Sequence, residues 1–245
     1  MRGGAELIFS RAREQTVLSK SCWGLPLQIQ RPIRGPTGEA IVTLLCPTGD
    51  LLEGDELHLE VICEPGTDVV LRQASATRLH GCEQGKIAFT GRFQIGAEAR
   101  LRYLPWELIP YAQTDYCQRL QVDLDENGEA VLWEVLGPGR VWEIDAPRRV
   151  SLEVVARVQG HVAFADILRM NRPNRTATAG HTHVGSLLLL GQNYAQQDAD
   201  RIHDALVGTG LVGSASRLPQ HGVGARALGD SADALFRAFE GLLGY

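Results

Sequence analysis

Residues along much of this chain alternate between apolar and polar side chains with a period of two. Because successive side chains of a β-strand point to opposite faces, such a period predicts strands with one buried face. Turn sequences such as Asp-Glu-Asn-Gly at 125–128 separate the runs. The clearest runs are residues 57–63, 87–95, 120–124 and 150–154. We therefore predict a mainly β, multi-stranded and mostly antiparallel sheet assembly that extends to about Met170.

The chain changes character after these runs, where helical spacing replaces alternation. Residues 171–180 carry little periodicity and predict a loop. Asp198 is the predicted cap of a helix that ends near Gly208, and Ser231 begins a second, amphipathic helix. The predicted apolar faces are Ile202, Ala205 and Leu206 in the first helix, and Ala232, Leu235, Phe236, Phe239, Leu242 and Leu243 in the second. Further strands are predicted over residues 184–190, 211–217 and 222–228.

A chain of 245 residues is long enough to bury one large β-rich core. We predict a single domain over residues 1–245, with a β-rich part at 1–170 and a β/α part at 181–245. No internal repeat of fixed period is evident in the sequence.

The charge balance argues against a nucleic-acid partner. The chain has 24 basic and 29 acidic residues, for a net charge of -5, so it lacks the positive excess of a phosphate-binding surface. Lys20 and Lys86 are the only lysines, and neither follows a glycine-rich loop of P-loop form. Nucleotide hydrolysis by this chain is therefore not expected.

The cysteines and the apolar runs indicate a reduced, aqueous compartment. The five cysteines are odd in number and have no zinc-knuckle or dithiol spacing: Cys22, Cys46, Cys63, Cys82 and Cys117. The N-terminus lacks a signal-peptide pattern, and the longest apolar run, near 187–190, is far too short to span a bilayer. We therefore expect a cytoplasmic protein without a membrane segment.

A rigid corner is predicted between two strands at residues 103–111, Tyr-Leu-Pro-Trp-Glu-Leu-Ile-Pro-Tyr. Pro105 and Pro110 each lock their own φ, remove a backbone donor and push the preceding residue into an extended conformation. The segment is therefore shaped before it packs, and we expect it to orient the strands beside it.

His181 and His183 form the sharpest metal-like pair. Residues two apart in an extended segment face the same way, so both imidazoles can approach one soft cation such as nickel. A solvent-exposed loop pair without a ligand is the alternative, because no third ligand is evident from the spacing. His80 beside Cys82 has the same geometry.

Several carboxylates interrupt or border the apolar strands, where an unpaired carboxylate is costly unless it is hydrated or faces a channel. The ordinary alternative is that they occupy the solvent-facing positions of the strands. None of them has a neighbouring nucleophile or base partner of a recognised catalytic pattern. The residues are Asp55, Glu56, Glu134, Glu143 and Asp166. Catalysis is therefore not predicted.

The proline corner and a downstream segment, Gly139-Arg140-x-x-Glu143, resemble the urease accessory protein family called UreD or UreH. Two further stretches are similar to family motifs, each with departures. Residues 47–55 are similar to the PxGGxxxGD stretch, with Asp50 replacing one glycine. Residues 73–80 contain a stretch similar to the ATKxY end of the QxATKxY strand, with Arg78 for lysine and His80 for tyrosine. The resemblance runs nearly end to end.

This resemblance implies a cytoplasmic urease maturation chaperone and not an enzyme. It implies docking on apo-urease and on the helical accessory protein UreF, which in turn recruits the GTPase UreG. It also implies an elongated, β-helix-like array of strands with two α-helices near the C-terminus. The apolar stripe of the closing helix adds an expectation from the residues themselves, namely a surface that a partner covers.

The resemblance further implies that nickel, delivered through GTP hydrolysis by the partner, travels through the accessory complex to urease. By that resemblance Asp55, Glu56, Glu134 and Asp166 match carboxylates proposed to line the path. No tightly bound cofactor is expected, and Ni²⁺ is expected only in transit, because scattered oxygen ligands release nickel more readily than a cage of cysteines and histidines. The alternatives are a purely structural adaptor that does not conduct nickel and an unrecognised β-rich hydrolase.

Overall fold

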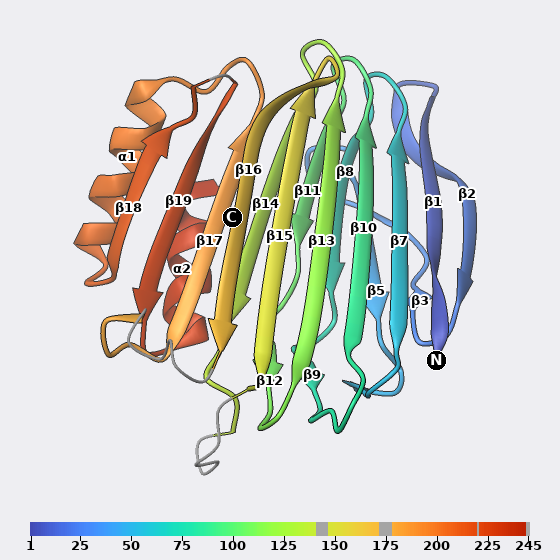
Figure 1. Ribbon diagram of the computed structural model, residues 1–245. Helices are drawn as coiled ribbons and strands as arrows, with labels where there is room; N and C mark the ends of the chain where they lie inside the picture. Colours follow the sequence, from blue (N-terminus) through green and yellow to red (C-terminus); the bar gives the residue numbers. More distant parts are fainter. Residues whose placement is uncertain (141–146, 172–177, 220, 244–245) are drawn as a thin grey trace.

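A computed structural model describes residues 1–140, 147–171, 178–219 and 221–243 (Figure 1). It is mainly β, with helices α1 (Gln196–Gly208) and α2 (Ala232–Leu243) near the C-terminus, as predicted. The strands are β1 (Arg2–Ala12), β2 (Gln15–Gly24), β3 (Gln28–Ile29), β4 (Ile33–Arg34), β5 (Ala40–Leu45), β6 (Asp50–Leu51), β7 (Glu56–Cys63), β8 (Asp68–Gln73), β9 (Thr77–Leu79), β10 (Ile87–Ile95), β11 (Arg100–Leu104), β12 (Leu108–Pro110), β13 (Asp115–Leu124), β14 (Glu129–Leu136), β15 (Arg149–Val158), β16 (His161–Asn171), β17 (His183–Leu190), β18 (Val212–Arg217) and β19 (Gly222–Gly229).

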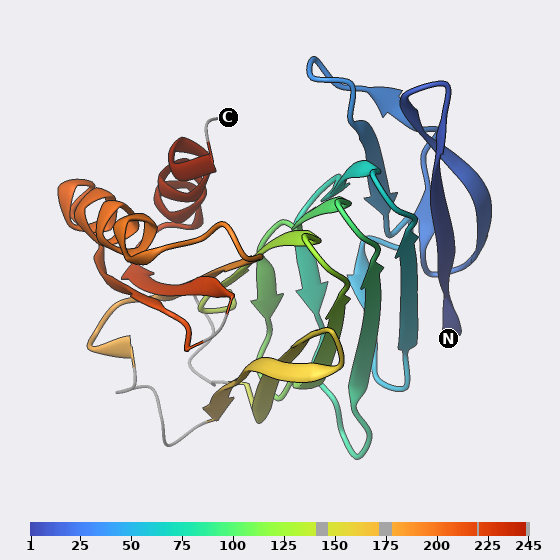
Figure 2. The same cartoon turned by 90° about the horizontal axis from the view of Figure 1, so that it is seen from above.

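The strands wind into a flattened coil whose two broad sides are sheets of seven and twelve strands within the described residues (Figure 2). From β7 the chain crosses to β8 in the opposite sheet, passes the short strand β9, and returns to β10 beside β7. Later circuits repeat this path. As a result β5, β8, β11 and β14 are parallel neighbours on one side, and β7, β10, β13 and β15 on the other. This is the β-helix-like array that the resemblance implied.

The prediction of mostly antiparallel pairing is wrong for the centre of both sheets. The predicted turns do reverse the chain, but each reversal leads into the opposite sheet, so β13 and β14 are consecutive in sequence without being paired. Alternation reports which face of a strand is buried, not which strand lies beside it. Antiparallel pairs within the described residues lie only at the ends of the sheets, as in β1–β2, β15–β16 and β14–β17–β19–β18. The circuits start at residues 40, 68, 100 and 129, so their lengths are unequal and no fixed period appears.

Apolar columns from the two sheets face each other inside the coil. Val61, Phe93 and Val122 lie in register on three neighbouring strands and are fully buried. In the facing sheet Leu71 lies in register with Tyr103, and the ring centroids of Phe93 and Tyr103 are 5.0 Å apart. These in-register contacts between circuits form the main core.

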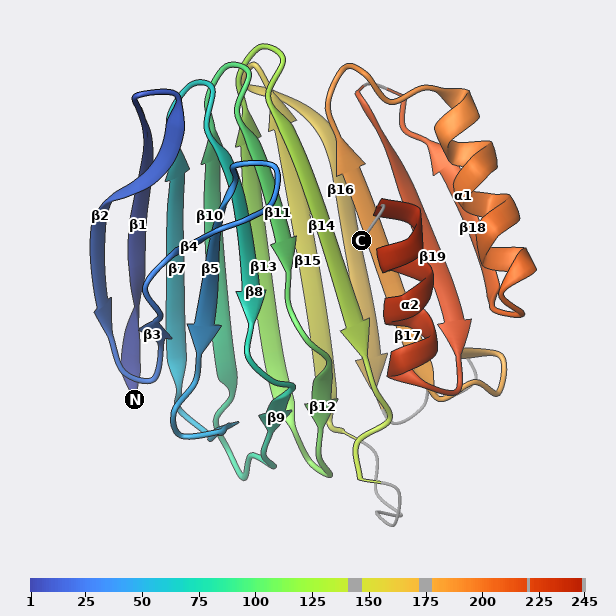
Figure 3. The same ribbon diagram turned by 180° about the vertical axis from the view of Figure 1, so that it is seen from behind.

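The twelve-stranded sheet continues into the C-terminal part, because β17 pairs with β14 and β19 pairs with β17. Helices α1 and α2 cover the outer face of this end of the sheet (Figure 3). The ring of Trp133 in β14 lies 5.9 Å from Phe236 and 6.2 Å from Phe239 of α2. The apolar stripe of α2 is thus buried by its own chain, and the expectation that a partner covers it is wrong.

Helix α1 begins at Gln196, two residues before the predicted cap. Ala195 is the N-cap residue, and Asp198 is the third residue of the helix. The Asp198 carboxylate accepts a hydrogen bond of 2.9 Å from the Ala195 backbone N–H. Residues 172–177 of the predicted loop lie outside the described residues. Neither helix in the described residues has the length and apolar character needed to cross a membrane.

Candidate functional site

Glu134 lies in β14, a strand that is buried on both faces. Its neighbours Trp133 and Val135 pack in the cluster beneath the helices, whereas Leu132 and Leu136 belong to the core inside the coil. Alternation therefore places Glu134 on the inner face, and it is only 8% exposed. A carboxylate in that place requires polar partners or water.

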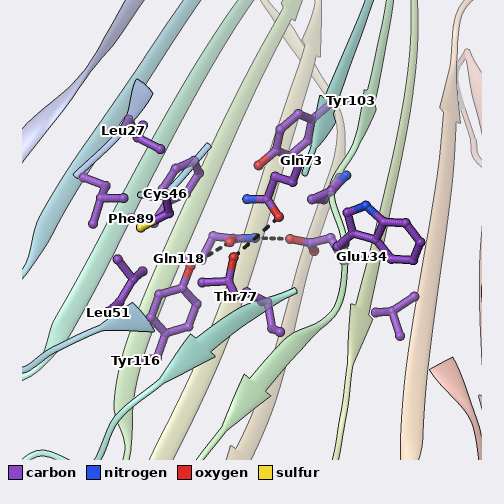
Figure 4. A pocket seen from close by; sticks show the side chains of 15 residues that line it. Leu27, Cys46, Leu51, Gln73, Thr77, Phe89, Tyr103, Tyr116, Gln118 and Glu134 are labelled. Atoms are coloured by element: carbon purple, nitrogen blue, oxygen red, sulfur yellow. Dashed lines mark hydrogen bonds between the residues drawn. The ribbon is translucent and has the colours of Figure 1, made fainter. Parts of the chain in front are cut away.

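The hydrogen-bond partner of Glu134 comes from β13 in the opposite sheet (Figure 4). Gln118 Nε2 donates a hydrogen bond to Glu134 Oε1, and the Tyr116 hydroxyl donates to Gln118 Oε1 at 2.9 Å. Tyr103 from β11 lies beside them, and burial raises the pKa of both tyrosines, so both hydroxyls stay protonated. All four residues line a space of about 30 Å³, which we call the interior cavity. A space of this size is large enough for an ordered water, since roughly 10–15 Å³ suffices.

A second and larger space lies on the other side of Glu134. This groove, of about 330 Å³, separates β16 from the sheet formed by β14, β17, β19 and β18. The carboxylate of Asp166 on β16 forms an ion pair with the guanidinium of Arg226 on β19 across it. Ser186 and Ser214 add hydroxyl groups to its lining. Within the described residues Glu134 is the only one that lines both the groove and the interior cavity.

Burial raises the pKa of Glu134 to about 7. The Gln118 hydrogen bond and the Arg226 charge act against this rise, and the Asp166 charge adds to it. Near neutral pH this carboxyl therefore exists in both the protonated and the ionised form. The ionised form carries the negative charge that attracts a cation, and the protonated form does not.

Asp55 and Glu56 lie apart from the groove and the interior cavity. The Asp55 carboxylate, 4% exposed, contacts the amino group of Met1 and accepts the Leu52 N–H at 2.8 Å. Glu56 pairs with Arg2, with 3.1 Å between Nε and Oε2. Neither carboxylate lines the groove or the interior cavity. The structure thus brings together Glu134 and Asp166 from the predicted set, and not all four residues.

The two candidate histidines have separate carboxylate partners. His181 Nδ1 lies 3.2 Å from Asp230 Oδ2, and His183 Nε2 lies 3.2 Å from Glu107 Oε1. His183 begins β17, and His181 precedes it. Among the described residues no three His, Cys, Asp or Glu side chains are grouped so that they can hold one metal ion.

The proline corner and the Gly-Arg segment meet in space. Pro105 O accepts a hydrogen bond of 2.8 Å from the Trp133 indole. The Arg140 guanidinium carbon lies 3.9 Å from the centroid of the Tyr111 ring, which follows Pro110. Gly139 has φ +92°, and a Cβ there would lie 2.3 Å from Pro110 O. Only glycine therefore fits. Glu143, the last residue of the predicted motif, lies outside the described residues.

Comparison with known proteins decides the family. The family model described as UreD urease accessory protein matches residues 1–245. The chain belongs to the UreD family. It is 28% identical to the urease accessory protein UreD of Cenarchaeum symbiosum (strain A) over 96% of this chain and 87% of the relative. It is 36% identical to UreD of Deinococcus radiodurans over 57% of this chain and 50% of the relative, and 27% identical to UreD of Thermosynechococcus vestitus over 84% and 78%.

Asp50 pairs with both Arg78 and His80, the two residues noted above in the stretch 73–80. Asp50 Oδ1 lies 2.5 Å from Arg78 Nε, and Asp50 Oδ2 lies 2.7 Å from His80 Nε2. The imidazole also packs edge-on against Tyr111, with ring centroids 5.0 Å apart. Strands β6 and β9 are neighbours in the coil, so residues far apart in sequence form one cluster.

Sequence reasoning missed Gln118, Tyr116 and Arg226. One signal was available for Gln118, because it occupies the inward phase of β13 two residues before Leu120, where the pattern calls for an apolar side chain. Arg226 is the single charged residue in β19, a strand of small and apolar side chains. A polar residue at an apolar position is the feature that marks this site.

Proposed function

We propose that this UreD-family protein is a non-catalytic urease maturation chaperone of the cytoplasm that also conducts nickel. The single observation that carries the nickel route is the position of Glu134, the only described residue that lines both the groove and the interior cavity. A buried carboxylate with solvent-accessible space on two sides can accept a cation from one space and release it into the other. Two carboxylates without thiolates bind nickel weakly enough for transit.

The proposed route enters at the groove, passes Asp166, and reaches the interior cavity through Glu134. The interior cavity extends along the coil to Leu51 and Leu57. Asp55 and Glu56 lie between these two residues in the chain, and we assign the second pair of carboxylates to the later part of the route. Gln118 and Tyr116 supply further oxygen atoms along the way. We assign no role in the route to His181 and His183, whose imidazoles are held by separate carboxylates.

The partners proposed for this chain follow from its family. We propose that it docks on apo-urease and on a UreF-type accessory protein, and that a UreG-type GTPase joins through the latter. We assign the GTP hydrolysis that accompanies nickel delivery to this GTPase, because the sequence of the present chain has no glycine-rich loop of P-loop form. Large exposed apolar residues available for such contacts include Leu25, Ile33 and Trp106.

The test replaces the two carboxylates of the route by their amides, as E134Q/D166N. These substitutions keep the side-chain shape and one carbonyl oxygen as a hydrogen-bond acceptor, while removing the negative charges that attract a cation. We expect the variant to assemble normally with urease and the UreF-type partner, and the nickel content of matured urease to fall severalfold. The measurement is nickel per urease active site, with a pull-down of both partners in parallel.

The matched control is D123N/E153Q, which changes two carboxylates on the seven-stranded sheet that do not line the groove or the interior cavity. This control should load nickel like the unsubstituted chain. Normal assembly together with unchanged loading by E134Q/D166N would exclude the route and favour the structural adaptor, in which nickel travels outside this chain. The Asp166–Arg226 pair is the observation that favours the adaptor, because a guanidinium already occupies the carboxylate.

A further inference from the structure

A row of polar side chains crosses four neighbouring strands at the groove. Glu134 of β14 lies opposite Ser186 of β17, Ser186 lies opposite Arg226 of β19, and Arg226 lies opposite Ser214 of β18. Residues in register on adjacent strands project from the same face of a sheet. All four line the groove, so the row leads from the edge strand β18 inward to Glu134.

Arg226 holds the central place in this row. Its guanidinium reaches across the groove to Asp166 on β16, a strand that belongs to the other sheet. Within the described part of the chain it is the only basic residue that lines the groove. Its charge also acts on Glu134, where it favours the ionised carboxylate. The Arg226 guanidinium therefore forms an ion pair with Asp166 and also favours the ionised form of Glu134.

We propose that Arg226 is a charged gate that keeps the groove closed to divalent cations in the free chain. A metal ion approaching Asp166 meets a guanidinium that already pairs with the carboxylate and donates a hydrogen bond to it. Binding therefore requires displacement of the guanidinium. This inference deepens the proposed nickel route, because it states when the route is open.

The position of the ion pair allows displacement. The side chains of Arg226 and Asp166 are 39% and 36% exposed, so an acidic group presented at the mouth of the groove can compete with Asp166 for the guanidinium. Docking of a partner that carries such a group would free Asp166 and Glu134 for the metal ion. The gate thereby ties cation entry to assembly.

Titration of the purified full chain with Ni²⁺ tests the gate, with binding measured by calorimetry. A unit positive charge about 6 Å from a divalent cation, in surroundings as polar as water, repels the cation enough to weaken its binding about tenfold. Removal of that charge therefore raises the affinity by about the same factor. We therefore expect R226Q to bind Ni²⁺ about tenfold more tightly than the unsubstituted chain. R226K, which keeps the charge, should bind within about threefold of the unsubstituted chain. The triple variant R226Q/E134Q/D166N should lose the gain.

The matched control is R237Q, which removes an arginine paired with Asp233 on the exposed surface of α2 and leaves the groove intact. It should not change Ni²⁺ affinity. R226M, which keeps the apolar part of the stem, replaces R226Q if thermal melting shows that the latter is unfolded. A folded R226Q or R226M with unchanged affinity would overturn the gate, and so would a gain that persists in the triple variant. Failure of the nickel route would instead appear as unchanged urease loading by E134Q/D166N, so the two ideas fail separately.

Discussion

Replacing Glu134 by glutamine should make the folded chain more stable at alkaline pH and leave its stability nearly unchanged at acidic pH. The pKa of Glu134 is raised from 4.5 to about 7 by burial. The folded protein therefore keeps a proton that the unfolded chain releases between these two values. Stability falls as the pH rises through this window and levels out above pH 7.

The size of the effect follows from the width of that window. Each pKa unit corresponds to about 1.4 kcal/mol, so the ionisable carboxyl lowers the free energy of unfolding by about 3 kcal/mol above pH 7. E134Q has no proton to lose and keeps an oxygen to accept the hydrogen bond from Gln118. Its melting temperature should exceed that of the unsubstituted chain by roughly 5–10 °C at pH 8.

Urea unfolding of both proteins at pH 5 and pH 8 measures this difference. D123N serves as a control because the Asp123 side chain is 52% exposed, so its substitution should not reproduce the pH dependence. If the stability difference between E134Q and the unsubstituted chain were the same at both pH values, the reasoning from burial would be refuted. A stability difference that grows between pH 5 and pH 8 would show that the chain retains a destabilising carboxylate between the groove and the interior cavity. Retention of a destabilising group is typical of a functional residue.

Three further outcomes are expected. The double variant P105A/P110A should lose on the order of 1 kcal/mol of unfolding free energy per site, because alanine gives the unfolded chain more conformations than proline does. Urease activation should fall with stability, and unchanged melting and activation would show that the corner is incidental. Ala at Gly139 should cost more than Ala at Gly180, since both have φ near +90° but only Gly139 would place a Cβ against Pro110 O; equal melting temperatures would contradict this steric account. Co-expression with a UreF-type partner should raise the soluble yield severalfold, and a monodisperse monomer without affinity for that partner would count against the chaperone proposal.

Local patterns in the sequence determined the elements of this protein. Each predicted run of alternation lies in a strand, and the stripe from Ala232 to Leu243 is helix α2. These features are readable because they depend on residues a few positions apart. The same holds for the corner at 103–111, where two prolines restrict the backbone whatever surrounds them.

Only the tertiary structure decided how these elements pair and which polar residues meet. Turns that look like hairpin turns lead instead from one sheet to the other, because pairing with the strand one circuit earlier is a long-range contact that no local pattern records. Asp166 and Glu153 both occupy strands rich in alternating residues, yet only Asp166 faces Arg226. Glu134 is functional in our proposal because it lies between two cavities and opposite Gln118, and both facts arise only when circuits that are distant in sequence stack upon one another.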